Sequence, residues 1–491
     1  MEQRILSGYS RSADRSVHRL EAKVATDLLG TEIVHYSVID GVVHTSTSVR
    51  ALCRRLGRVD LNPLALAEAL AFGLTLRDET VVLQVRSIPP HSTLHPDGTL
   101  VRHPGPVSTG AIDDPAAASR EMRGILDGIL RAEEPRYQVH CVGYTGGKDS
   151  RILAALPKAD PDRWHFISVS GRDDAEHTGS AKHARQLGLA HHAWMEWTAD
   201  FLAPREGPAH RISADLANGV GAVSDTTLLR SYFEQYRETV LGRGPEDEGV
   251  ALWIGALADS LFAGTYLPPI APAAATIWDA LAPRTAHLPR VLARSVLQRF
   301  DDERAFYGTN PFSFTPASDD EVGMFIRLFT RGRSYICRLL ACFDRVCPTQ
   351  INPYLHPALI DLALAIHPRL RVADALRSGV LAGLGPGLDA PSAFGYRAPG
   401  YSEAVLTALS EEARRCAVLD RVLEPGLLAD LRENRYPDLA AADPVAAGKP
   451  AYRSYAQEPG NRLRSLRDYE HVLTYATFLN LLAEDGVAIQ G

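Results

Sequence analysis

The chain has 491 residues, of which 45% are hydrophobic and 23% are charged, and its formal net charge is −7. This composition is typical of a folded protein of roughly two or three domains, and it excludes an intrinsically disordered or fibrous chain. The negative net charge provides no overall positive field that would attract nucleic acid or an anionic membrane.

Neither a targeting segment nor a membrane span is expected. The first thirty residues alternate charged and polar side chains and lack the apolar segment of a secretory signal. No stretch approaches the roughly 18 apolar residues that a membrane-spanning helix needs. We therefore expect a cytoplasmic protein with no membrane or nucleic-acid partner. The six cysteines include no Cys-x-x-Cys pair, and we interpret them as small buried hydrophobic residues rather than metal ligands or disulfides.

The first hundred residues have the pattern of a β-rich region with one helix. Apolar and polar residues alternate on both sides of Asp40-Gly41, a pair that is typical of a hairpin turn. A segment rich in proline and glycine, 104–115, is the predicted linker to the next region. The predicted elements are strands over 31–37, 42–47, 81–85 and 99–101, and a helix from Asn62-Pro63 to Phe72.

An amphipathic helix is predicted next, over 116–131, and two β-α units follow it. Strand, turn, helix, strand and helix are expected over 140–143, 145–150, 151–156, 164–169 and 176–187. This order is typical of a parallel sheet whose ligands bind at the carboxyl ends of the strands. His191 and His192 are expected to cap the last of these helices, and the rest of the chain is mostly helical.

The turn Thr145-Gly146-Gly147-Lys148-Asp149-Ser150 is the segment most indicative of chemistry. Its two glycines allow a sharp turn whose backbone amides face an anion at a helix N-terminus. The carboxylate of Asp149 would repel a bare phosphate, so it fits only if a divalent cation lies between them. The segment is neither a Walker P-loop nor a dinucleotide GxGxxG motif. An ordinary glycine turn capped by Asp149 and Ser150 is the alternative that these residues leave open.

This turn resembles the pyrophosphate loop, Ser/Thr-Gly-Gly-x-Asp-Ser, of the N-type ATP pyrophosphatases. Further segments narrow the resemblance to asparagine-synthetase-like enzymes, including the β-lactam synthetases. In chain order these segments are Leu61–Leu94, Asp173–His192, Gly255–Tyr266, Asn352–Pro368 and Gly395–Pro399. Gly255–Tyr266 (GALADSLFAGTY) resembles the second signature of that family, GEGADELFGGY.

The resemblance implies an α/β fold of two parts. Residues 1–112 would form a truncated, inactive, β-rich glutaminase-like domain of the Ntn kind. Residues 113–491 would form a parallel-sheet ATP-pyrophosphatase domain (adenine nucleotide α-hydrolase-like) with a helical C-terminal part. Glutamine-hydrolysing relatives carry a catalytic cysteine directly after the initiator methionine, where this chain has Glu2, and its first cysteine is Cys53. Without that thiol no glutamyl thioester can form, so glutamine hydrolysis is not expected.

The resemblance also implies ATP and Mg²⁺ as cofactors. It assigns the nucleotide to Thr145, Gly146, Gly147, Lys148, Asp149, Ser150, Val169 and Ser170, with adenine beside the last two. It assigns magnesium to Asp149 and Asp259. Two carboxylates on separate loops suit magnesium ions that bridge phosphates.

Some positions depart from the family pattern. Ala256 stands where the family has a Glu or Tyr that handles the attacking amine, and Ser260 replaces the second acid of that signature. Ala393 replaces a lysine that stabilises the adenylate charge, and His356 replaces an aspartate. The residues that could substitute are Lys449, Arg397 and Arg151 for the charge, and Tyr266 and Tyr396 for the base. An arginine such as Arg151 is more commonly exposed and solvated.

These patterns predict an ATP-dependent amide-forming ligase that activates a small-molecule carboxylate as an acyl-adenylate for attack by a substrate amine. Antibiotic or other specialised-metabolite biosynthesis is the setting that the resemblance implies, and a homodimer is left open. A cyclase that closes a macrolactam in a ribosomal peptide is an alternative, as is a nucleotide-binding pseudoenzyme that serves as an interaction subunit. RNA thiolation is disfavoured because the net charge is negative and no paired cysteines follow the motif.

Overall fold

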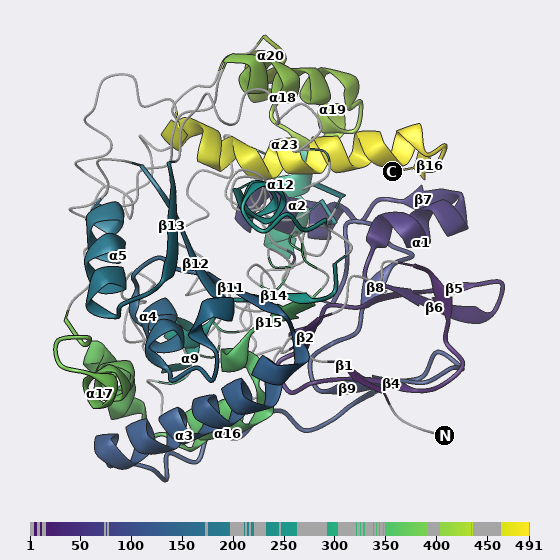
Figure 1. The fold of residues 1–491 in the computed structure, drawn as a ribbon. Coiled ribbons are helices and arrows are strands. Elements are labelled where there is room, and N and C mark those ends of the chain that lie inside the picture. The colour runs from purple at the N-terminus through teal and green to yellow at the C-terminus, as the bar shows by residue number, and fades with distance from the viewer. Residues whose placement is uncertain are drawn as a thin grey trace.

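The computed structural model describes part of the chain, and everything below refers to this part. The described residues are 4–6, 10–11, 16–72, 75, 78–171, 175–196, 211, 214–215, 218–219, 232–244, 247–262, 292–302, 321, 325, 328, 337, 340, 343, 347, 349–390, 403–433, 435 and 463–490. They form a central sheet covered by helices, with smaller β-sheets of the N-terminal region beside it (Figure 1).

The central sheet is mostly parallel. Its strands are β2 (Ser10–Arg11), β11 (Val139–Gly143), β12 (Trp164–Ser170), β13 (His191–Glu196), β14 (Val250–Trp253) and β15 (Thr349–Ile351). The spatial order is β13-β12-β11-β14-β15-β2, and β2 alone among these is antiparallel to its neighbour. In chain order, β12 and β13 are thus added on one side of β11, and β14 and β15 are then added on its other side. The predicted α/β class with a parallel sheet is confirmed.

Both faces of this sheet are covered, which explains why its strands are apolar at consecutive positions. On β14, Ala251 and Trp253 pack into a core with helices α3, α4 and α16, whereas Val250 and Leu252 pack against the helical residues 232–239. The helices around the first core are α3 (Pro115–Glu133), α4 (Lys148–Ala155), α5 (Ala175–Gln186), α9 (Ala258–Phe262), α16 (Pro357–Ala365) and α17 (Ala375–Leu384).

Helix α3 illustrates how local sequence produces these elements. Asp114 caps its N-terminus by accepting a hydrogen bond from the Ala116 N–H, and a proline follows at the first helical position. Ala118, Met122 and Leu126 are spaced by one helical turn and are buried, so they form a stripe that faces the sheet. The predicted helix over 116–131 is confirmed.

Two small sheets make up the N-terminal region on the right of Figure 1. One contains β3 (His18–Arg19), β6 (Val42–Ser46), β5 (His35–Ile39) and β8 (Arg86–Ser87); the other contains β1 (Arg4–Leu6), β4 (Val24–Thr26), β9 (Ser92–Leu94) and β10 (Leu100–Arg102). Asp40 and Gly41 join β5 to β6 with φ values of 51° and 74°, the positive angles of a tight hairpin turn. The predicted hairpin is confirmed.

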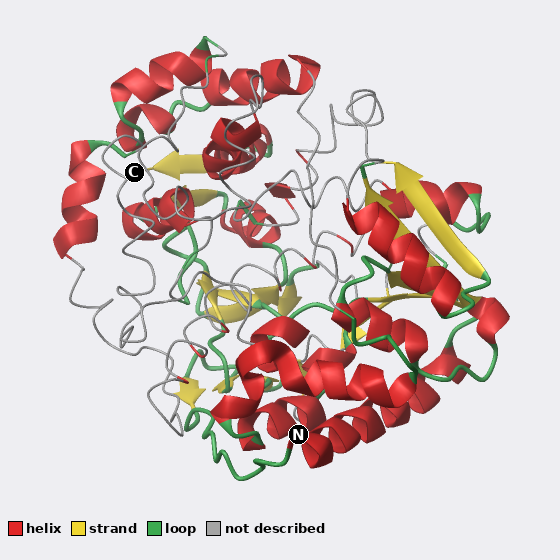
Figure 2. Ribbon diagram, turned by 90° about the vertical axis from the view of Figure 1, so that its left-hand side faces the viewer, coloured by secondary structure: helices red, strands yellow, loops and turns green. Residues whose placement is uncertain are grey.

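A second core joins the beginning and the end of the chain. Its elements are α1 (Val49–Leu56), β7 (Arg58–Asp60), α2 (Pro63–Phe72), α12 (Arg294–Asp302), α18 (Glu403–Arg415), α19 (Leu419–Val422), α20 (Pro425–Arg432), α23 (Leu463–Glu484) and β16 (Ala488–Gln490). Strand β16 pairs in parallel with β7, and Leu52 and Phe478 belong to the same buried cluster. Figure 2 shows the helices of this core grouped apart from those around the central sheet. The two predicted domains therefore share a core, and a boundary near residue 112 stays a prediction.

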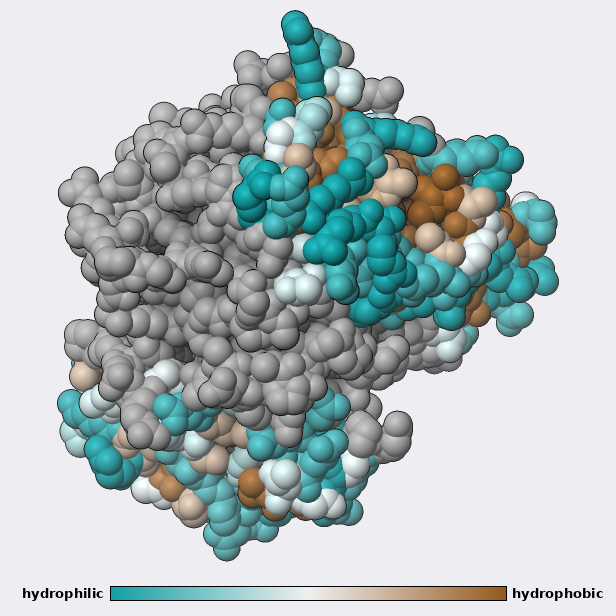
Figure 3. Space-filling model, turned by 90° about the horizontal axis from the view of Figure 1, so that it is seen from above, coloured by the Kyte–Doolittle hydropathy of each residue, from teal (hydrophilic) through white to brown (hydrophobic). Residues whose placement is uncertain are grey.

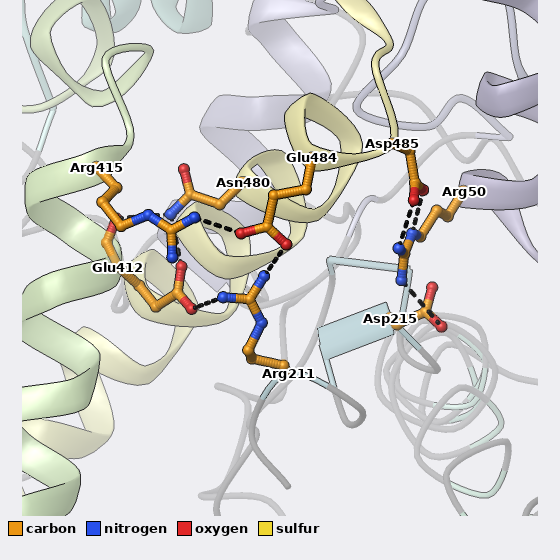
Figure 4. Close-up of polar contacts among 8 residues, drawn as sticks. All are labelled: Arg50, Arg211, Asp215, Glu412, Arg415, Asn480, Glu484 and Asp485. Carbon is orange, nitrogen blue, oxygen red and sulfur yellow. Dashed lines mark hydrogen bonds and ion pairs between the residues drawn. The ribbon is translucent and has the colours of Figure 1, made fainter. Parts of the chain in front are cut away.

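Seven charged side chains and one asparagine also connect these elements, in what we call the junction network (Figure 4): Arg50, Arg211, Asp215, Glu412, Arg415, Asn480, Glu484 and Asp485. Arg50 donates two hydrogen bonds to Asp485, of 2.5 Å from Nε and 2.7 Å from Nη2. Arg211 donates to Glu412 at 2.8 Å, and both Arg211 and Arg415 contact Glu484. These pairs tie α1, α18 and the C-terminal end of α23 together.

The described surface is mixed in polarity. On the face that Figure 3 shows, most described residues are hydrophilic, with small apolar areas between them. The large hydrophobic side chains that are most exposed come from separate parts of the chain: Val38, Leu83, Val101, Val107 and Val240. Among the described residues, no helix is both long enough and apolar enough to cross a lipid bilayer.

Two predicted elements are wrong. Residues 81–85 form a turn in which Val82 makes one isolated bridge to Leu61, and Thr80 donates a side-chain hydrogen bond to the Val85 carbonyl at 2.8 Å. The valines there are buried in the second core, and this burial, rather than a strand, accounts for the apolar pattern. His191 and His192 begin strand β13 instead of capping a helix, since α5 already ends at Gln186.

Candidate functional site

The candidate site lies at the carboxyl ends of the two middle strands. The glycine turn 145–147 connects β11 to α4, and residues 254–257 connect β14 to α9. Strands β11 and β14 are neighbours in the sheet, but the strands that follow β11 in sequence lie on its other side. In open α/β sheets, ligands bind outside the carboxyl ends of the strands where the strand order reverses in this way. The predicted glycine turn is therefore at the position where the topology favours a ligand.

Gly146 is required by the shape of the turn. Its φ of +71° is unfavourable for a residue with a Cβ, and a Cβ there would lie 2.8 Å from the Cα of Ser180 on α5. Side-chain hydroxyls then brace the turn. The Gly147 N–H donates to the Thr145 Oγ1 at 3.2 Å, and the Ser150 Oγ donates to the Gly147 carbonyl at 3.1 Å. The residues predicted to surround pyrophosphate are thus brought together at the start of α4.

Asp149 is held on two sides. Its carboxylate accepts a hydrogen bond of 2.5 Å from the Nη1 of Arg377, and its backbone carbonyl accepts one of 3.0 Å from the Tyr354 hydroxyl. Arg377 donates through Nε to Asp374 at 2.6 Å, and the Lys148 Nζ lies 2.8 Å from the other oxygen of Asp374. We call Lys148, Asp149, Asp374 and Arg377 the site network. It joins the N-terminal ends of α4 and α17.

The electrostatics of Asp149 are unusual for a paired carboxylate. Burial raises its pKa to about 6, and the nearby carboxylates of Asp259 and Asp374 add to this rise, although the Arg377 guanidinium opposes it. Asp374, at the start of α17, adopts a left-handed conformation with a φ of 58°, which is strained for a residue other than glycine. Three carboxylates thus lie close together here, and their repulsion and the strain at Asp374 both cost free energy.

The loop of residues 254–257, between β14 and α9, brings Asp259 near Asp149. A Cβ at Gly255 would lie 3.1 Å from the Asp149 Cβ, so the absence of a side chain at 255 permits this close approach. The Asn352 side chain holds the loop by donating a hydrogen bond of 3.1 Å to the Ala256 carbonyl. Asp259 lies in the first turn of α9 and is close enough to Asp149 to raise its pKa.

The donor set of Asp149 and Asp259 fits magnesium. The described residues contain no group of three or more His, Cys, Asp or Glu side chains arranged to hold a metal by themselves. Magnesium commonly binds through one or two carboxylates and completes its coordination with phosphates and water. Two neighbouring carboxylates beside a phosphate-sized glycine turn match this pattern, and their mutual repulsion would be relieved by a divalent cation.

The residues predicted to lie beside adenine are at the same edge of the sheet. Val169 and Ser170 end β12, the neighbour of β11. The Ser170 hydroxyl accepts a hydrogen bond of 3.0 Å from the Trp194 indole on β13. Trp194 also packs on His177 of α5, with ring centroids 4.0 Å apart. An adenine ring at this place would lie near this aromatic pair.

The four residues predicted to be catalytic, Lys449, Tyr266, Tyr396 and Arg397, lie outside the described residues. Arg151, another candidate for the positive charge, is fully buried rather than exposed, which corrects our expectation. Its Nη1 donates to the Leu388 carbonyl at 2.6 Å and to the Ala390 carbonyl at 2.8 Å. Arg151 thus connects α4 to the segment after α17 instead of facing the turn.

His356, which the sequence analysis compared with an aspartate of the resembling enzymes, caps a helix. Its Nδ1 accepts a hydrogen bond of 3.2 Å from the Ala358 N–H at the start of α16. An aspartate side chain can make the same contact, so the substitution preserves a cap.

Sequence reasoning missed Arg377, Asp374, Tyr354 and Asn352. Arg377 and Asp149 are 228 residues apart, and no local pattern links two such positions. The spacing of Asp374 and Arg377 by three residues does indicate a pair on one helical face, but it does not indicate what else the pair contacts.

Comparison with known proteins adds no relative. No model of a known protein family matches this chain, and no curated protein sequence matches it.

Proposed function

We propose that this protein is an ATP-dependent ligase that forms an amide bond by activating a substrate carboxylate as an acyl-adenylate. One observation carries the proposal. A glycine turn and two coupled carboxylates, Asp149 and Asp259, lie together at the point of the parallel sheet where the strand order reverses. This is the arrangement expected for a nucleotide whose phosphates are bound together with magnesium.

Each part of the site has a role in this proposal. The turn of Gly146 and Gly147 would receive the pyrophosphate at the start of α4, where the helix dipole favours negative charge. Asp149 and Asp259 would hold magnesium, which would supply positive charge to neutralise the leaving phosphates. Val169 and Ser170 lie beside the adenine.

The reaction consists of two displacements. A carboxylate oxygen of the first substrate attacks the α-phosphorus of ATP, and pyrophosphate leaves. The nitrogen of an amine then attacks the acyl carbon, the bond to AMP breaks, and the amine gives up a proton. Both substrates are small molecules in the leading form of the proposal.

Titration calorimetry with magnesium and ATP tests the proposal. We would compare the wild type with Asp149→Ala and Asp259→Ala. Asp162→Ala is the matched control, because Asp162 is an exposed carboxylate at the opposite, amino-terminal edge of the same sheet. Micromolar binding by the wild type and the control, lost in the two site variants, would support the nucleotide site.

Mixtures of carboxylates and amines would then be screened for release of AMP. Nucleotide binding without AMP release from any mixture would favour the pseudoenzyme alternative. A wild type that is folded and binds no ATP in the presence of magnesium would contradict the proposal.

A further inference from the structure

Arg377 is the feature of the site that the proposed function does not yet use. Its side chain is only 6% exposed, and the residue lies in the first turn of α17. Nη1 contacts Asp149 and Nε contacts Asp374. The described residues provide no hydrogen-bond partner for Nη2. A guanidinium has donors fixed in one plane, a geometry that suits phosphate as well as carboxylate.

The other cations near the turn form hydrogen bonds or ion pairs with other groups. The Lys148 Nζ is held by Asp374 and by the Ser378 hydroxyl at 2.7 Å. Arg151 donates to backbone carbonyls beyond α17, and its charge also acts on Asp149 and Asp374. Among the described residues, Arg377 is therefore the cation that contacts the Asp149 carboxylate directly.

The charges of the site are balanced for a change of partner. Arg377 contacts Asp149 and Asp374, Lys148 contacts Asp374, and Asp259 lies close enough to Asp149 to raise its pKa. Arg377 therefore offsets part of the repulsion between Asp149 and its neighbouring carboxylates. A divalent cation on Asp149 would take over this role and leave the guanidinium available to an anion.

We propose that Arg377 binds the pyrophosphate part of the nucleotide. Its guanidinium pairs with Asp149 while no divalent cation is present, and it donates to phosphate oxygens once that carboxylate is engaged by one. This inference rests on the proposed function. It also supplies the positive charge for which the sequence has Ala393 in place of a lysine.

Inorganic pyrophosphate with MgCl₂, and MnCl₂ alone, are the probes for this inference. We would measure pyrophosphate binding by calorimetry and Mn²⁺ binding by electron paramagnetic resonance on the full chain. The variants are Arg377→Met and Arg377→Lys. Arg123→Met is the control, because Arg123 donates to the Gly383 carbonyl at 2.7 Å, at the other end of α17.

We expect Arg377→Met to weaken pyrophosphate binding by at least about tenfold, the loss of one charge-assisted hydrogen bond. Mn²⁺ binding should be unchanged or tighter, because a competitor for Asp149 has been removed. Arg377→Lys should retain part of the pyrophosphate affinity, since it keeps the charge and loses the planar fork. Arg123→Met should bind both probes like the wild type.

Two results would overturn the inference: equal pyrophosphate binding by Arg377→Met and the wild type, or a parallel loss of pyrophosphate and Mn²⁺ binding. The parallel loss would mean that Arg377 only positions Asp149. If Arg377→Met does not fold, the double variant Arg377→Gln/Asp374→Asn removes the cation together with a carboxylate and is subject to the same criteria.

The controls separate this inference from the proposed function. A wild type that binds neither ATP nor pyrophosphate contradicts both. If Arg377→Met binds ATP and pyrophosphate as tightly as the wild type does, only the role of Arg377 is contradicted, and the proposed function is not.

Discussion

The junction network and the site network contain the same kinds of residue, arginines with carboxylates, but they affect those carboxylates in opposite ways. In the junction, hydrogen bonds from Arg50 lower the pKa of Asp485, and those from Arg211 and Arg415 lower the pKa of Glu484. In the site, burial raises the pKa of Asp149 to about 6 even though Arg377 contacts it.

The difference follows from charge balance and burial. Glu484 and Asp485 lie at the partly exposed C-terminal end of α23, and each is contacted by an arginine. At the site, Asp259 and Asp374 crowd Asp149, which is packed deeper in the protein although its side chain is 23% exposed. In the junction, arginines contact the carboxylates at the end of α23, whereas at the site a divalent cation from outside would relieve the repulsion between Asp149 and its neighbouring carboxylates. This contrast is the one expected between charges that stabilise a fold and charges that, as we propose for the site, bind a ligand.

The largest predicted effect compares one glycine from each region. Gly57, which ends α1, and Gly146 share a φ of +71°, but a Cβ at Gly57 meets nothing within 4 Å. We expect Gly57→Ala to lower the free energy of unfolding by about 1–2 kcal/mol through backbone strain alone. Gly146→Ala should lower it by about 2–4 kcal/mol, since contact with the Ser180 backbone adds to the strain.

Urea denaturation measures both losses, and calorimetry should show that Gly146→Ala alone abolishes ATP binding. Equal losses of stability, or ATP binding by Gly146→Ala, would mean that α5 does not constrain the turn.

The second prediction neutralises one carboxylate in each network. With a chelator present at pH 8, Asp485→Asn should cost about 1–2 kcal/mol of stability, because it removes a partly buried, two-bonded ion pair. Asp149→Asn should cost less, or stabilise the fold, because the ionised Asp149 is itself unfavourable there.

The pH dependence of this comparison has a definite sign. The raised pKa of Asp149 means that the folded wild type binds an extra proton between its ordinary value and about 6. The wild type therefore gains stability relative to Asp149→Asn as the pH falls from 7 to 5, which urea denaturation at several pH values would measure. For Asp485, whose pKa is lowered, the stabilisation should be lost only at lower pH. A wild type that loses stability relative to Asp149→Asn on acidification would refute the assignment.

The smallest predicted effects lie within the junction. Arg211 contacts Glu412, whose side chain is 4% exposed, whereas Arg415 is itself 52% exposed and its contact with Glu484 is screened by solvent. We expect Arg211→Met to cost about 1–2 kcal/mol and Arg415→Met less than about 0.5 kcal/mol. Thermal and urea unfolding of the two variants would measure the difference. The reverse order would show that burial does not govern the strength of these pairs, and neither variant should change ATP binding.

Much of the fold could be predicted because its signals are local. The Asp40-Gly41 hairpin depends on two adjacent residues that accept positive φ, and α3 depends on a cap and a helical stripe. Predictions failed where a local pattern had two meanings. The apolar pattern of 81–85 suits a strand, but its valines are buried within a turn. The pair His191-His192 begins a strand because β12 lies beside it.

The site divides in the same way. The turn 145–150 could be identified because its residues are contiguous and their shape and charge depend on one another. Arg377 could not, since its partner is brought to it by the packing of α17 against α4. The buried position of Arg151 was missed for the same reason.

The sequence alone therefore determined the strand–turn–helix that can hold an anion, because backbone conformation, helix capping and side-chain spacing are properties of neighbouring residues. Only the tertiary structure decided that Asp259, Asp374 and Arg377 surround Asp149 and that the pKa of this carboxylate is raised. Burial and charge proximity depend on which distant segments fold against each other, and these two quantities set the energy of the site.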